Sequence, residues 1–113
     1  MADPEKDLEQ RLKDLQAHVD RVQQAQQEIE GAISEQDHQK RRVNDRLERG
    51  EGGAELEGER DRLASSQAEN EHDRDSNSRQ LEQLRREREE LERRLRDLKA
   101  NTASGRSGGG GGA

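Results

Sequence analysis

The large aliphatic residues between Leu8 and Leu47 recur with a strict seven-residue period. With heptad position d at Leu8, nine of the twelve a and d positions in this stretch carry Leu, Ile or Val. Every other apolar residue in the stretch is an alanine. An apolar stripe confined to positions a and d predicts one long helix that packs in a coiled coil.

Turn and capping residues predict where this first helix begins and ends. Asp3 fits the N-cap, Pro4 the first helical position, and Glu5 the positive end of the helix dipole. Glycine at position 50 can adopt the left-handed conformation that closes a helix. The strongest break inside the chain is a glycine cluster: Gly50, Gly52, Gly53 and Gly58. We therefore predict a first coiled-coil helix over residues 1–49 and a glycine-rich turn over residues 50–55.

A second and weaker heptad pattern follows in a different phase. With d at Leu56, every remaining leucine falls on a or d, but only seven of the thirteen such positions up to Leu98 are aliphatic. Residues 65–78 are rich in Ser, Asn and Asp, whose side chains compete for backbone hydrogen bonds. We predict a second coiled-coil arm over residues 56–100 with a weak point near 75–78. A flexible glycine-rich tail should follow over residues 101–113.

A turn between the arms sets an antiparallel register when Leu47 is placed opposite Leu56. Aliphatic positions then largely face aliphatic positions, and amides face amides. The main pairs are Leu12 with Leu91, Leu8 with Leu95, Gln36 with Gln67, and Gln26 with Asn77. The exceptions are arginines, Arg60, Arg74 and Arg88, which can lay their stems along the seam.

Charges beside the seam favour the hairpin only in part. His18 near Glu87 and Arg46 near Glu59 attract, whereas Arg11 near Arg94 and Glu9 near Glu92 repel. The rival arrangement, a parallel homodimer, brings together Glu87 with Glu92 and Arg94 with Lys99, and both pairs repel. The fold class we predict is all-α: an elongated antiparallel coiled-coil helical hairpin.

Composition indicates that such a hairpin needs further cover. The chain of 113 residues has no aromatic residue, 24% hydrophobic residues and 42% charged residues, so it cannot build a compact core. Sixteen half-buried aliphatic residues offset too little of the entropy of ordering about ninety residues, at roughly 1–2 kcal/mol each. We therefore expect the hairpin to be part of a multi-helix bundle.

Charge, cysteine content and hydropathy exclude several classes. A net charge of −6 disfavours non-specific binding to nucleic acid or anionic membranes. Without cysteine the chain has no disulfide framework or thiolate metal site. It also lacks a signal-peptide core and a long apolar run, which predicts a soluble protein of the cytoplasm, with the nucleus as the alternative.

Two spacings that suggest chemistry are better explained by solvent-exposed helix faces. Glu35 and His38, and likewise Glu69 and His72, have the E-x-x-H spacing of di-iron bundles, but they occupy the outward positions c and f. The arginine-rich stretch 85–96 carries interleaved glutamates and has no aromatic residue to stack a base. We predict no metal, no cofactor and no enzymatic activity.

These patterns predict a structural, scaffolding or adaptor coiled-coil protein that mediates protein–protein assembly. Its partner would be another helical protein or further copies of itself, with no membrane partner. Two alternatives are a nucleic-acid-associated factor that uses the arginine-rich helix and a disordered chain that folds on a helical partner. The predicted partner-binding seam consists of Leu8, Leu12, Leu15, Val19, Val22, Ile29, Ile33, Val43, Leu47, Leu56, Leu63, Leu81, Leu84, Leu91, Leu95 and Leu98.

Overall fold

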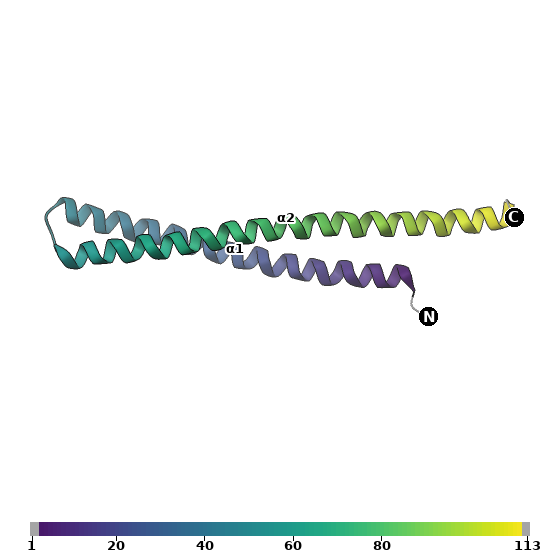
Figure 1. Ribbon diagram of the computed structural model, residues 1–113, viewed down its shortest axis with the longest axis horizontal. Helices are drawn as coiled ribbons and strands as arrows, with labels where there is room; N and C mark the ends of the chain where they lie inside the picture. Colours follow the sequence, from purple (N-terminus) through teal and green to yellow (C-terminus); the bar gives the residue numbers. More distant parts are fainter. Residues whose placement is uncertain (1–2, 112–113) are drawn as a thin grey trace. The chain divides into compact units, whose positions relative to one another are not determined.

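Two long helices make up the described part of the chain, which covers the backbone of residues 3–111 and the side chains of residues 3–103. In the computed structural model, helix α1 spans Pro4–Glu48 and helix α2 spans Ala54–Gly111, with a short turn between them (Figure 1). The described residues contain no strand. The predicted all-α helical hairpin is confirmed.

The first turn of α1 is capped as its sequence predicts. One carboxylate oxygen of Asp3 accepts a hydrogen bond from the backbone N–H of Glu5 at 3.0 Å. The Asp3 carbonyl accepts the first helical bond, from the N–H of Asp7, at 3.0 Å. Asp3 is therefore the N-cap, and Pro4 takes the first helical position, where its missing N–H is not needed.

The C-terminal end of α1 closes in a Schellman motif around Gly50, whose φ is +78°. The N–H of Gly50 donates to the Leu47 carbonyl at 3.0 Å, and the N–H of Glu51 donates to the Arg46 carbonyl at 2.9 Å. In most Schellman motifs, the residues at the positions of Arg46 and Glu51 also make an apolar contact. Here the Arg46 guanidinium instead lies 3.4 Å from the Glu51 carboxylate. Arg46 was expected near Glu59, and the turn gives it a closer partner.

Helix α2 differs from the sequence-based prediction in three places. It begins at Ala54, two residues before the predicted arm, and it continues without a break through residues 75–78. It also extends beyond the predicted end near Ala100, to Gly111. The Thr102 hydroxyl donates to the Leu98 carbonyl at 2.8 Å, which satisfies its polar atom inside the helix. The flexibility of the 101–113 tail stays a prediction, and residues 112–113 lie outside the described part.

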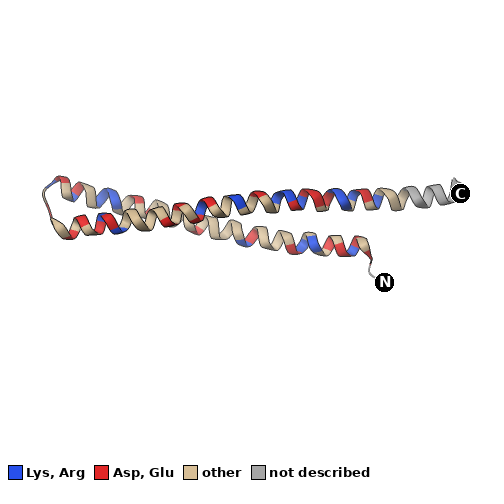
Figure 2. Cartoon of the chain, in the orientation of Figure 1, with Lys and Arg blue, Asp and Glu red and all other residues tan. Residues whose placement is uncertain are grey.

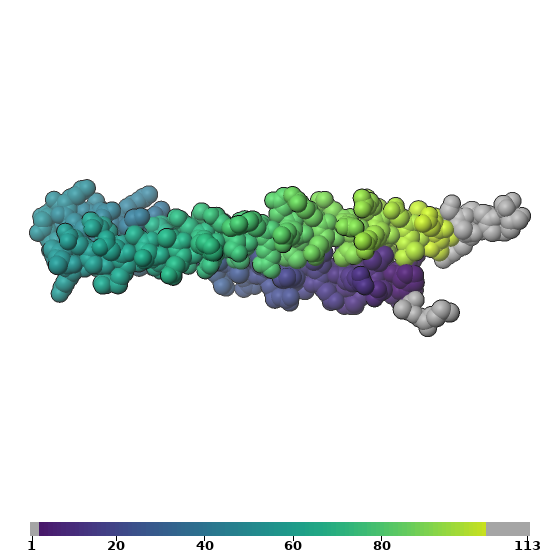
Figure 3. All heavy atoms as spheres, viewed as in Figure 1, coloured from purple at the N-terminus to yellow at the C-terminus, as the bar shows by residue number. Residues whose placement is uncertain are grey.

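The chain divides into two units, each of which contains a part of both helices. Unit 1 pairs α1 up to Arg21 with α2 from Leu81 onward, and unit 2 comprises residues 22–80 around the turn. Figure 3 shows the side chains of the two helices in contact within each unit. In unit 1, Gln16 contacts Arg88 while the earlier Glu9 contacts the later Lys99, so the segments are antiparallel.

Candidate functional site

The seam is the candidate site, and its burial follows the predicted heptad phase. Every predicted a or d position between Leu8 and Leu98 is buried or half-buried, including the polar ones. The most buried aliphatic side chains are Leu15, Val19 and Leu84 in unit 1 and Val22, Val43 and Leu56 in unit 2. The structure therefore places all sixteen predicted seam residues on the sides where the helices face each other. Their binding of a partner stays a prediction.

The packing of this seam is incomplete. Among the described residues, no side chain is fully buried. In unit 1, Leu8, Leu12, Leu91, Leu95 and Leu98 are only half-buried. Two helices in contact cover each other along one line, so the outer sides of a and d residues stay in water.

Amide side chains form a hydrogen-bonded ladder in the middle of unit 2. Gln36 donates to the Ser66 hydroxyl at 2.8 Å and accepts from the Asn70 amide at 3.0 Å. Gln67, which is only 6% exposed, donates to the Asp37 carboxylate at 2.7 Å and accepts from Lys40 at 3.0 Å. The carboxamide of Gln67 is thus satisfied at both its nitrogen and its oxygen.

This ladder fits the predicted register but not the predicted pairs. Gln36 was expected to pair with Gln67 directly. Gln36 instead bonds to residues on either side of Gln67, and Gln67 bonds to two residues that follow Gln36. Ser66 and Asp37 were not expected as partners, because the predicted amide pairs involve only a and d positions. Ser66 lies at g and Asp37 at e, so the register itself would have placed both beside the seam.

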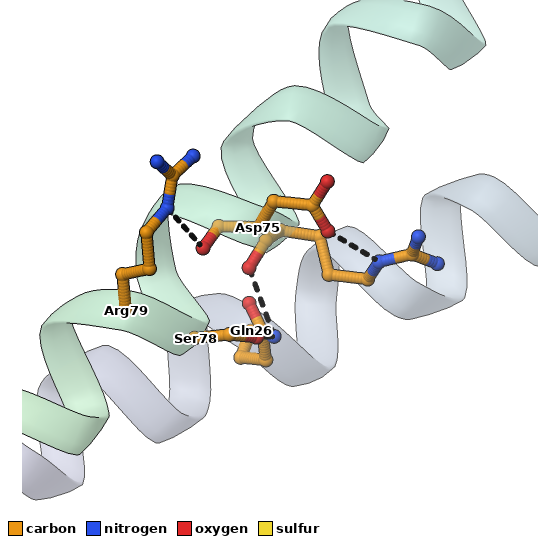
Figure 4. Close-up of polar contacts among 5 residues, drawn as sticks. Gln26, Asp75, Ser78 and Arg79 are labelled. Carbon is orange, nitrogen blue, oxygen red and sulfur yellow. Dashed lines mark hydrogen bonds and ion pairs between the residues drawn. The ribbon is translucent and has the colours of Figure 1, made fainter.

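Gln26, another amide at an a position of unit 2, is only partly satisfied; Figure 4 shows its surroundings in close-up. Its amide nitrogen donates to the Arg74 carbonyl at 3.2 Å and to the Ser78 hydroxyl at 2.9 Å. Its amide oxygen is buried and accepts no hydrogen bond from the described residues. Asn77, the predicted partner, lies at a d position of α2 between Arg74 and Ser78, but the bonds of Gln26 go to these two residues instead. A buried acceptor without a donor destabilises the seam locally.

Three arginines at seam positions behave as the sequence predicts. The side chains of Arg60, Arg74 and Arg88 are 35% to 43% exposed, so each is partly covered while its head group reaches water. Each head group also contacts an acidic neighbour on α2, at 3.4 to 3.8 Å. Arg88 additionally donates to the Gln16 amide oxygen at 3.1 Å.

Three of the six arginines in residues 85–96 of α2 pair with glutamates of the same helix. Arg86 lies 3.0 Å from Glu82, and Arg94 lies 2.9 Å from Glu90, both one helical turn apart. Figure 2 shows basic and acidic residues alternating along this part of α2. Such pairing lowers the local positive potential. Binding of nucleic acid by this face stays a prediction.

The two E-x-x-H pairs lie in solvent. Glu35, His38, Glu69 and His72 are all exposed. The described residues contain no group of three or more His, Cys, Asp or Glu side chains arranged to hold a metal ion.

A groove of about 480 Å³ lies beside the seam in unit 1. Its apolar lining comes from Leu15 and Leu91, which are both d positions. Its remaining lining is charged or titratable and comes from positions c and g of both helices: Arg11, Asp14, His18, Glu87, Glu90 and Arg94. The expected neighbours His18 and Glu87, and Arg11 and Arg94, thus line one groove.

Comparisons with known proteins assign no function to this chain. No protein-family model, curated protein sequence or solved structure matches this chain. In the described residues, neither helix has an apolar stretch that would cross a lipid bilayer.

Proposed function

We propose that the protein is a non-catalytic structural scaffold or adaptor of the cytoplasm that assembles with other helices through its a/d seam. The observation that carries this proposal is the incomplete burial of the seam. Leucines such as Leu12, Leu91 and Leu95 lie in the same seam as the buried Leu15 and Leu84, yet remain partly exposed to water. Additional helices would cover this surface, at about 25 cal/mol for each Å² of apolar area removed from water.

Exposure of the potential catalytic groups supports a non-catalytic role. The titratable side chains with suggestive spacing, Glu35 and His38 among them, lie on the outer helix faces. An acid or base in open solvent lacks the fixed position and reduced polarity that general acid–base catalysis uses. Binding of helical partners requires only the seam.

Paired charge substitutions test this proposal. The double variant Leu12→Lys and Leu15→Lys puts two ammonium groups into the seam, where burial of unpaired charge is costly. We expect it to lose helicity by far-ultraviolet circular dichroism and to lose assembled mass by light scattering. The control variant Gln10→Lys and Ala17→Lys adds the same charge at exposed f positions and should retain both. A seam variant with the helicity and mass of the control would refute the proposal.

A further inference from the structure

We propose that the groove in unit 1 docks onto the same groove of a second copy, with the two copies related by a two-fold axis across the groove. This inference rests on the proposed function, because it names the partner of the seam as the chain itself. The bundle it forms consists of two hairpins that meet at Leu15 and Leu91.

The order of charges along the groove carries the inference. On α1, Arg11 precedes Asp14 by one helical turn, and on α2, Arg94 follows Glu90 by one turn. Because the helices are antiparallel, both arginines lie at one end of the groove and both carboxylates lie inward of them. Glu87 adds a third carboxylate further inward. The groove is thus positive at its arginine end and negative further inward, and His18 of α1 completes its lining beyond Glu87.

A two-fold rotation reverses this order in the second copy. The two arginines of each copy then face the carboxylates of the other, and each contact occurs twice, as in an isologous interface. A two-fold axis parallel to the groove would instead keep the order and set arginines against arginines and carboxylates against carboxylates, which costs several kcal/mol. The charges therefore select one orientation of a second copy.

The arginines retain donors for such contacts. Arg94 lies 2.9 Å from Glu90 and Arg11 lies 3.5 Å from Asp7, and both side chains are more than half exposed. A guanidinium has five N–H donors, so one intrahelical pair leaves others for a carboxylate of the second copy. Between these charges, docking would cover Leu91, which is half-buried in the hairpin.

Charge reversal with complementation tests the proposal on the full-length chain. The variant Arg11→Glu and Arg94→Glu has an acidic groove, and the variant Asp14→Arg and Glu90→Arg has a basic one. By sedimentation equilibrium, we expect each variant alone to raise the dimer dissociation constant at least about tenfold, since like charges now meet. An equimolar mixture of the two should restore dimers.

A matched control separates groove contacts from net charge and from folding. Arg41→Glu and Arg42→Glu makes the same change in charge as the Arg11→Glu and Arg94→Glu variant, but at exposed positions of unit 2, so its dimer dissociation constant should stay at the wild-type value. Circular dichroism of each variant measures its helicity. A groove variant that loses helicity alone and regains it in the equimolar mixture also supports the proposal.

Three results would overturn the inference, and they separate it from the proposed function. A wild-type chain that sediments as a monomer overturns it, as do groove variants that dimerise like the control or a mixture that does not restore dimers. If the groove variants leave the dimer dissociation constant unchanged but the Leu12 and Leu15 double variant no longer dimerises, the proposed function of the seam is retained and the groove proposal is refuted. If that double variant also changes nothing, both proposals fail.

Discussion

The Leu56 side chain lies where a Cβ atom on Gly52 would be placed, so the turn accepts only glycine there. Gly52 also has a φ of +74°, in the left-handed region that side chains disfavour. Leu56 in turn is 5% exposed and forms the first seam contact of α2. The turn and the start of the second arm therefore depend on each other.

Gly52→Ala should destabilise the hairpin by about 2 to 4 kcal/mol, because it adds backbone strain to the overlap with Leu56. The measurement is urea unfolding followed by circular dichroism. Gly31→Ala is the matched control: it lies within α1, and a Cβ there meets nothing within 4 Å. That substitution should stabilise the protein by up to about 1 kcal/mol. Equal effects of the two substitutions would contradict the proposed packing of the turn.

Replacing Gln26 with methionine should stabilise the protein by about 1 kcal/mol, because it removes a buried amide oxygen that has no donor. Ser78 would lose its partner, but its side chain is exposed and water can replace the bond. The control Gln27→Met changes an exposed neighbour and should stay within about 0.5 kcal/mol. Thermal unfolding of both variants checks this, and a lower midpoint for Gln26→Met than for Gln27→Met would disprove it.

Asp3→Ala should loosen the first turn of α1 and cost about 1 kcal/mol, since the N–H of Glu5 loses its side-chain acceptor. Amide hydrogen exchange at Glu5 should quicken, while exchange in the middle of α1 should not change. Asp3→Ser keeps an acceptor at the N-cap and should restore most of the protection. Unchanged exchange at Glu5 in Asp3→Ala would show that the cap contributes nothing.

The heptad pattern, the capping residues and the glycine cluster were enough to predict the hairpin, the phase of both arms and the capping of α1. Such features depend on spacing within a short stretch of sequence. The aliphatic residues from Leu8 to Leu47 form one apolar stripe, and Gly50, Gly52 and Gly53 mark one turn. The Schellman closure at Gly50 was likewise predictable, because glycine alone enters the left-handed region without cost. The same spacing gave the burial of Arg60, Arg74 and Arg88.

The details that were missed depend on contacts across the seam. A break near residues 75–78 was predicted from the low helix propensity of Asp, Ser and Asn. In the structure, Ser78 instead accepts a hydrogen bond from Gln26, so a tertiary contact occupies a side chain that could compete with the helix. The bonds of Gln36 to Ser66 and Asn70 show the same limit, because heptad letters identify neighbours but not donors and acceptors.

Spin-label distances across unit 1 test whether its α1 and α2 segments pair in the predicted antiparallel register within one chain. The chain has no cysteine, so labels can be attached singly to cysteines introduced at exposed f positions. With one label at Gln10, a second would be placed at Arg86, Arg93 or Ala100 in three separate variants. Successive sites differ by one heptad, roughly 10 Å along the helix.

We expect double electron–electron resonance to give the shortest distance for Gln10 with Arg93, and dilution with unlabelled chain to leave this distance unchanged. A minimum at Arg86 or Ala100 would contradict the register. A Gln10–Arg93 distance that disappears on dilution would show that the arms pair between chains, and the hairpin would be wrong.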